Sequence, residues 1–461
     1  MEVNVIGAGL AGSECALQLA KQGIKVNLYE MRPEKMTGAH VSENFAEFVC
    51  SNSLGSYDIT NASGLLKHEM EILGSELIKV AYECQVPAGG ALAIDRELFS
   101  KRITQLIEQN PNINIIKEEI TQIFDIPTVI ASGPLTSDGL ANSIKEFTQS
   151  EHLHFFDAIA PIVECGSINF DTAFYANRYD KEEAKSKKLK AKGNEFIQIS
   201  SNASYINCPM DREQYEKFYN ILINAPKIEL KEFEKDAKFF ESCLPIEVLA
   251  SRGFDTLRFG PMKPVGLIDK RTGKENYAVV QLRQDNSAKT LYNLVGFQTN
   301  LKWSAQKELL HSIPGLENAN IVRYGVMHRN TFINSPKVLN ATLQTRKRPD
   351  LFFAGQITGV EGYTESIATG MLAGINMARY LKNIARQVCP LCELPRETML
   401  GALCAYISDK NHEKFQPINS NWGIVTPIDL PKKDRKNKKL KNELLAKRSI
   451  EYLNNLEISK Y

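Results

Sequence analysis

Apolar residues at the start of the chain follow the pattern of a buried strand that leads into a helix. An apolar run over 3–6 enters Gly7-Ala8-Gly9-Leu10-Ala11-Gly12, and a second apolar run over 25–29 ends at Glu30. A strand, Gly-x-Gly-x-x-Gly, a helix and a second strand that ends in an acid are typical of a βαβ unit that binds a dinucleotide. The pattern therefore predicts a nucleotide site at the N-terminus.

Each glycine of this turn has a separate role in that interpretation. Gly7 permits the tight turn, Gly9 lets a pyrophosphate approach the backbone, and Gly12 lets the helix pack closely on the strand. The free N–H groups at the helix N-terminus attract phosphate. The spacing of Glu30 from the turn suits an acceptor for ribose hydroxyls. The expected pyrophosphate contacts are Gly7, Ala8, Gly9, Leu10, Ala11 and Gly12.

The rest of the first 160 residues also has an α/β pattern. Apolar residues at helical spacing predict helices over 63–79 and 96–109. A glycine-rich turn over 87–91 separates them, and 128–134 is a short buried strand that ends in Gly-Pro.

The pattern changes between about 160 and 320. Short strand-like runs occur at 196–199 and 277–282, and loop clusters occur at 259–266 and 292–298. We interpret this part of the chain as a separate α+β insertion.

The α/β pattern then returns. An apolar strand over 351–356 enters a glycine-rich segment, and 365–381 is helical, with small residues that allow another backbone to come close. These small residues are Ala368, Gly370, Ala373 and Gly374. The same chemistry at both ends indicates one nucleotide-binding domain interrupted by an insertion, an arrangement common in flavoproteins. We expect its parts at 1–160 and 321–425, the insertion at 161–320, and a basic C-terminal tail at 426–461.

Composition limits the classes of function. The chain has 461 residues, 56 Lys plus Arg and 54 Asp plus Glu, so its net charge of +2 does not by itself indicate a nucleic-acid partner. No apolar run approaches the roughly 20 residues that span a bilayer, and a strand that begins by residue 3 leaves no room for a signal peptide. We expect a cytoplasmic protein without a membrane partner. Nine cysteines without compact spacing favour reduced thiols.

Several further motifs occur in an order that is similar to one family. The chain resembles the bacterial folate- and FAD-dependent tRNA uracil-5-methyltransferases from residue 2 to about 425. The motifs that carry the resemblance are Gly7–Gly12, Tyr29–Pro33, Cys50–Ser53, Val86–Ala91, Asn207–Met210, Phe259–Gly266, Tyr324–Asn330 and Phe353–Gln356.

The resemblance implies a Rossmann-like FAD-binding domain, discontinuous in sequence, with an inserted α+β domain. It also implies a reaction: a methylene group passes from 5,10-methylenetetrahydrofolate to C5 of the T-loop uridine of tRNA and gives 5-methyluridine. FAD, recharged by NADH or NADPH, carries the one-carbon unit and supplies electrons. The implied partners are tRNA, through its T-arm, and the small molecules folate and NAD(P)H; no metal is implied.

Uracil C5 becomes nucleophilic when a thiolate adds at C6, and a base must later remove the C5 proton. Cys50 and Cys208 match the catalytic cysteine pair of the family. We assign C6 addition to Cys208 and proton removal to Cys50, with the exchanged roles left open. Either thiol needs a depressed pKa. The other cysteines, among them Cys15, Cys84, Cys165 and Cys243, have no polar cluster around them.

The remaining candidate residues belong to three groups. For FAD, Arg32 would neutralise phosphate or cover adenine, and the flavin end would meet Gly355, Gln356, Gly359 and Gly362. For folate, the resemblance implies that His328 stacks on the pterin, with help from Arg329 and Asn330. For RNA, the candidates are Arg283, which could instead bind the folate glutamate, a basic loop with Lys187, Lys188 and Lys190, and the charged run over 432–441.

Three other interpretations remain open. The same chemistry could act on a uridine of large-subunit ribosomal RNA. Cys389 and Cys392 could serve an FAD-dependent NAD(P)H disulfide oxidoreductase, or with Cys404 and His412 a metal site. The Gly355-Gln356 segment also resembles the flavoprotein of tRNA wobble-uridine carboxymethylaminomethylation, a non-catalytic scaffold in this interpretation.

Overall fold

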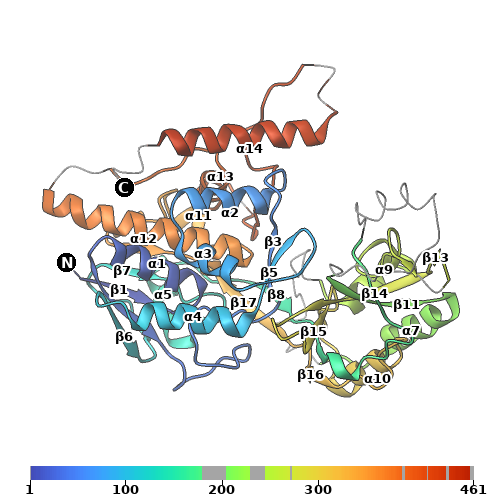
Figure 1. Ribbon diagram of the computed structural model, residues 1–461. Helices are drawn as coiled ribbons and strands as arrows, with labels where there is room; N and C mark the ends of the chain where they lie inside the picture. Colours follow the sequence, from blue (N-terminus) through green and yellow to red (C-terminus); the bar gives the residue numbers. More distant parts are fainter. Residues whose placement is uncertain are drawn as a thin grey trace.

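The computed structural model describes residues 2–178, 204–228, 244–269, 272–386, 390–412, 414–431, 434 and 436–456. They form two lobes (Figure 1). The first lobe is a five-stranded parallel sheet with its covering helices, and it contains both the first strand and the last helix that the structure describes. The second lobe is built from the middle of the chain around a six-stranded sheet.

The sheet of the first lobe has the order β18-β7-β1-β2-β6, and every neighbouring pair is parallel. Its strands are β1 (Glu2–Ile6), β2 (Lys25–Glu30), β6 (Ile113–Lys117), β7 (Thr128–Ile130) and β18 (Leu351–Phe353). Strand β18 comes from the C-terminal half of the chain and pairs with β7. The nucleotide-binding fold is therefore discontinuous in sequence, as predicted.

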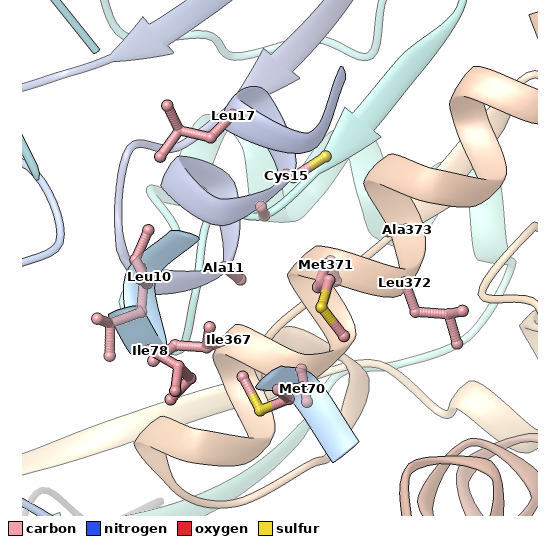
Figure 2. Packing of buried hydrophobic residues seen from close by; sticks show 14 of the residues in the cluster. Leu10, Ala11, Cys15, Leu17, Met70, Ile78, Ile367, Met371, Leu372 and Ala373 are labelled. Carbon is pink, nitrogen blue, oxygen red and sulfur yellow. The ribbon is translucent and has the colours of Figure 1, made fainter. Parts of the chain in front are cut away.

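Two long helices lie against each other over this sheet, α1 (Leu10–Lys21) and α12 (Tyr363–Arg386). A Cβ on Gly370 would lie 2.2 Å from the carbonyl oxygen of Ala11, and one on Gly374 would lie 2.8 Å from that of Cys15. Figure 2 shows the buried side chains around this contact, including Ala11, Cys15 and Ala373. The prediction that small residues admit another backbone is confirmed.

The helix expected over 63–79 is instead two helices, α2 (Ala62–Ile72) and α3 (Glu76–Glu83). Gly74 adopts a φ of +81° between them, and the Ser75 side chain accepts a hydrogen bond from the amide of Ile78. The apolar spacing continues across the break, so periodicity alone misses it, although a glycine followed by a serine is a helix-end and N-cap signal. The remaining elements around this lobe are α4 (Arg96–Glu108), α5 (Asp138–Thr148), α11 (Ser335–Val338) and the three-stranded sheet of β3 (Ser53–Ser56), β5 (Ala91–Ile94) and β4 (Gln85–Val86).

The second lobe is an antiparallel sheet in the order β10-β11-β14-β15-β9-β16. Its strands are β9 (Ile162–Glu164), β10 (Phe174–Tyr175), β11 (Tyr205–Met210), β14 (Ala278–Gln284), β15 (Leu291–Leu294) and β16 (Ile321–Arg323). Its other elements are α7 (Arg212–Asn224), α8 (Ile246–Ser251), α9 (Thr256–Phe259), α10 (Trp303–His311) and the hairpin of β12 (Ile268–Asp269) with β13 (Lys274–Glu275).

The strand predicted at 277–282 is confirmed as β14, whereas the loop expected at 292–298 begins within strand β15. The strand expected at 196–199 lies outside the described residues. Between the lobes, β8 (Leu153–Ala158) pairs antiparallel with β17 (Met327–Phe332), so the chain enters and leaves the second lobe side by side. The exact domain boundaries stay a prediction.

The C-terminal segment expected as a basic tail contains a helix, α14 (Lys438–Asn455), that packs on α2. Leu445, Ala446 and Leu453 on this helix are buried. Because lysine dominates this segment, an interpretation from composition alone misses its apolar stripe. No helix in the described part of the chain is long and apolar enough to cross a membrane.

Glu69 on α2 joins this helix to the lobe. Its buried carboxylate accepts hydrogen bonds from the amides of Met399 (2.6 Å) and Leu400 (2.8 Å), at the start of α13 (Met399–Ser408), and from the Ser449 hydroxyl on α14. Burial raises the pKa of Glu69 to about 7, although these hydrogen bonds oppose the rise.

We expect Gly370→Ala to lower the free energy of unfolding by about 1–3 kcal/mol, because the new methyl group cannot fit against the backbone of Ala11. Gly166→Ala is the matched control, since a Cβ there meets nothing within 4 Å. Equal stability of the two variants in urea unfolding would contradict the contact.

The second prediction concerns pH. Because the pKa of Glu69 is higher in the folded state than its ordinary value of 4.5, the folded state binds this proton more tightly. Its contribution to stability is complete below that ordinary value and is lost as the pH rises through about 7. The stability of Glu69→Gln should therefore fall less between about pH 5 and pH 8 than that of the wild type. Glu97→Gln, at an exposed position, should keep the wild-type slope.

Candidate functional site

A large cavity opens at the carboxyl ends of the parallel strands and encloses about 1010 Å³, counting the space open to solvent. Parallel α/β sheets bind ligands at this edge. The residues expected at the dinucleotide that line it are Gly7, Gly9, Leu10, Ala11, Glu30, Arg32, Gly355 and Gln356. Ala8, Gly12, Gly359 and Gly362 are not among its lining residues and shape the backbone behind it.

The glycine turn has space for a ligand at one position only. A Cβ on Gly7 would lie 2.6 Å from the carbonyl oxygen of Ala131, and one on Gly12 would lie 1.7 Å from that of Gly7. A Cβ on Gly9 would meet no atom within 4 Å. The turn is closed by its first and third glycines and open at the second, where a pyrophosphate approaches the backbone, so these residues fit the phosphates of FAD.

Glu30 ends β2 at the cavity. Its carboxylate accepts hydrogen bonds from the Ala8 amide (3.0 Å) and from the amide and guanidinium of Arg32. Burial acts to raise the pKa of Glu30, but the charge and hydrogen bonds of Arg32 outweigh it and hold the pKa below its usual value. The Glu30 carboxylate is therefore ionised and is able to accept hydrogen bonds from ribose hydroxyls.

The contacts of Arg32 differ from the phosphate or adenine contact that the sequence predicted. Its guanidinium is 1% exposed and pairs with both Glu30 and Glu47. Because two carboxylates balance its charge, Arg32 fixes Glu30 in place rather than presenting a free cation for phosphate.

The C-terminal half completes the far end of the cavity. Gly355 follows β18 with a φ of +77°, and a Cβ there would lie 2.7 Å from Cβ of Ala11. The Gln356 side chain donates to Glu361 (2.6 Å). Gly359 is covered by the Phe415 ring, because a Cβ there would lie 2.6 Å from it. The segment that follows β18 therefore meets the start of α1 directly.

Cys50 lies where this end of the cavity meets the second lobe. Tyr363 lines the cavity, donates its hydroxyl proton to Cys50 Sγ (2.9 Å) and accepts a hydrogen bond from the Cys50 amide (2.6 Å). Arg96 and Arg283 lie within electrostatic range of the sulfur. A hydroxyl donor and nearby cations favour a thiolate.

Cys208 lies elsewhere. In β11, Ile206, Cys208 and Met210 face the hydrophobic core of the second lobe, and Cys208 is fully buried. Burial raises its thiol pKa, and the charge of Glu317 adds to the rise. Side chains alternate across a strand, so the face of β11 that turns to the first lobe carries Tyr205 instead. The structure does not bring Cys208 together with Cys50, and its catalytic role stays a prediction that this placement does not support.

The folate candidates lie on β17, the strand that returns to the first lobe. His328 pairs with Asp157 and Asn330 with Phe155, and the Asn330 side chain is buried. The side chains of His328 and Arg329 lie outside the described residues, as do Lys187, Lys188 and Lys190. Arg283 is described, on β14.

The alternative cysteine sites gain no support. No group of three or more His, Cys, Asp or Glu side chains is arranged to hold a metal within the described residues. Cys392 and Cys404 are buried, and Cys389 and Cys243 lie outside the described residues.

Sequence reasoning missed Tyr363, Arg96 and Asp285. Arg96 forms an ion pair with Asp285, which joins the lobes. The position of Tyr363 just after the glycine-rich segment was a usable signal. The Arg96–Asp285 pair depends on tertiary structure and leaves no local pattern.

Comparisons with known proteins agree with this geometry. A family model described as glucose inhibited division protein A matches residues 2–385. A protein of Anoxybacillus flavithermus named methylenetetrahydrofolate–tRNA-(uracil-5-)-methyltransferase TrmFO is 54% identical over 99% of both chains. A protein of the same name from Halalkalibacterium halodurans is 54% identical over 98% of both. The chain belongs to the TrmFO family.

Solved structures extend the likeness to the fold. Aquifex aeolicus GidA superposes with a TM-score of 0.67 at 17% identity, over 100% of this chain and 74% of that one. This TrmFO-family chain therefore has the GidA-like fold. The cavity with its open second glycine fits FAD, the cofactor that the family resemblance implies.

We expect Tyr363→Phe to slow alkylation of Cys50 by iodoacetamide near neutral pH, because the thiolate loses its hydroxyl donor. Mass spectrometry of the labelled peptide measures the rate. Tyr82→Phe, whose hydroxyl bonds Glu71 on the surface, is the control. An unchanged Cys50 rate would show that the contact does not govern the thiol.

Proposed function

We propose that this protein transfers a one-carbon unit from 5,10-methylenetetrahydrofolate to C5 of a uridine in tRNA and thereby forms 5-methyluridine. The observation that carries the proposal is 54% identity, over 99% of both chains, to a relative with that named activity. A cavity that fits FAD and a polarised thiol at its far end support it.

The chemistry requires a methylene donor, two electrons and loss of the C5 proton. FAD, when bound and reduced, would supply the electrons and carry the one-carbon unit. Tetrahydrofolate leaves as the other product. Within our proposal the electrons come from NADH or NADPH, and the uridine is that of the T-loop. Since both lobes border Cys50, the target base must leave its stack to reach the sulfur.

The chain's own residues hold the reactants and move the proton. The Gly7–Gly12 turn and Glu30 would hold the cofactor, and Gly355 and Gln356, which line the same cavity, would hold its flavin part. His328, Arg329 and Asn330 would orient the pterin, as the family resemblance implies. Cys50 would take the C5 proton, and Tyr363 with the nearby arginines stabilises the thiolate that this role needs.

The activity test uses purified protein, FAD, NADH or NADPH, labelled methylenetetrahydrofolate and unmodified tRNA. Label in the T-loop uridine is the expected result, and Cys50→Ala should abolish it while FAD remains bound. Ribosomal RNA in place of tRNA tests the other target. The absence of label in either RNA would overturn the proposal.

A second experiment identifies the thiol that adds to C6. RNA with 5-fluorouridine at the target has no C5 proton to lose, so the covalent adduct accumulates. Because Cys208 is buried in an apolar core, we expect Cys208→Ala to keep the adduct. Loss of the adduct in that variant, with FAD retained, would restore the role to Cys208. The same adduct assay is applied to Cys50→Ala and Cys243→Ala.

A further inference from the structure

One arginine at the junction of the lobes forms no hydrogen bond or ion pair with the residues that the structure describes. Arg283 lies on β14, and its Nε is buried without a hydrogen-bond partner. Within the described part of the chain, its guanidinium enters no hydrogen bond or ion pair. Arg346 and Arg448 also have a buried Nε without a hydrogen-bond partner, but each donates from another guanidinium nitrogen to a carbonyl or amide oxygen.

The strand register directs Arg283 toward the first lobe. Tyr205 on β11 and Asn293 on β15 are its direct neighbours across the sheet, so the three side chains share one face. The Tyr205 hydroxyl donates to the carbonyl oxygen of Ala88 (3.2 Å), and the Asn293 amide donates to Asn52 (3.2 Å). Arg283 therefore lies between two contacts that join the lobes. One of them is made by Asn52, which is two residues from Cys50 in the same loop.

The carboxylate of Asp285, the residue that follows β14, forms no hydrogen bond or ion pair with Arg283. It accepts hydrogen bonds from the guanidinium of Arg96 and from Asn293 (3.0 Å) instead. Burial lowers the pKa of Arg283, although the charges of Tyr205, Asp285 and Cys50 oppose the shift. The residue is half-buried, and its buried Nε has no hydrogen-bond partner. An acceptor that arrives from outside would satisfy this donor.

We propose that Arg283 binds a phosphate of the target nucleotide and so places the uracil at Cys50. This inference rests on the proposed function. A planar guanidinium suits a phosphate oxyanion. The phosphate is attached to the sugar of the reacting base, whereas the glutamate of folate lies at the opposite end from its reacting pterin. A cation beside the thiol therefore fits the nucleotide better than the folate tail.

The test compares Arg283→Gln and Arg283→Lys with wild-type holoenzyme. Arg212→Gln is the matched control, an exposed arginine on α7 that pairs with Glu216. Three quantities are measured: the Kd for unmodified tRNA over a salt series, the KM values for tRNA and methylenetetrahydrofolate, and the thermal stability with FAD content.

For Arg283→Gln we expect Kd and KM for tRNA to rise about tenfold or more, with the folate KM unchanged. The slope of log Kd against log salt should become shallower by about one, since one phosphate contact is lost. Thermal stability should hold or rise, because no partner is left unpaired. Arg283→Lys should recover part of the affinity, and Arg212→Gln should match the wild type.

Three other outcomes would contradict a phosphate-binding site at Arg283. A raised folate KM with unchanged tRNA binding would assign Arg283 to the folate carboxylate. Loss of stability with an unchanged salt slope would make the residue structural, and no change in any quantity would remove its role. Binding is measured without turnover, so a wild type that binds tRNA without methylating it would reject the proposed function and leave the Arg283 site standing.

Discussion

The backbone contact between α1 and α12 is the constraint on which the rest of this structure depends. Gly370 and Gly374 let one helix rest directly on the carbonyl groups of the other. That contact sets how near the C-terminal segment comes to the glycine turn. Gly355 consequently packs against Ala11, and the two halves of the cavity, encoded far apart, meet around one ligand.

The second lobe is held to this frame through polar groups as well as through its paired connecting strands. Arg96 binds Asp285, Asn52 bonds to Gln284 and Asn293, and Asp95 accepts hydrogen bonds from Ser287. These contacts gather around the loop that carries Cys50. Polar groups that satisfy one another across a junction fix its geometry, because each loses its partner if the lobes shift. The position of the Cys50 sulfur is thus fixed by both lobes at once.

Local patterns were sufficient for β1, β2, β7, β14 and β18, for the glycine turn and for the small residues of α12, because each depends on neighbours in sequence. The role of Cys208, which came from the family resemblance, stays a prediction, and the structure places this residue on the core face of β11. Local patterns missed other features. They failed for the break at Gly74 and for α14, whose lysines conceal an apolar stripe. The pairing of Arg96 with Asp285 arises only when distant segments meet, as does the lack of a hydrogen-bond partner for Arg283 Nε among the described residues, so no sequence pattern could report either.

The position of β18 in the parallel sheet also affects synthesis of the protein. A ribosome releases β1, β2, β6 and β7 and then the entire second lobe before the last strand of the first sheet and its long glycine-containing helix emerge. Until then the edge of β7 and the apolar side of α1 have no cover. During synthesis, therefore, the N-terminal half of the sheet stays incomplete until β18 and α12 have emerged.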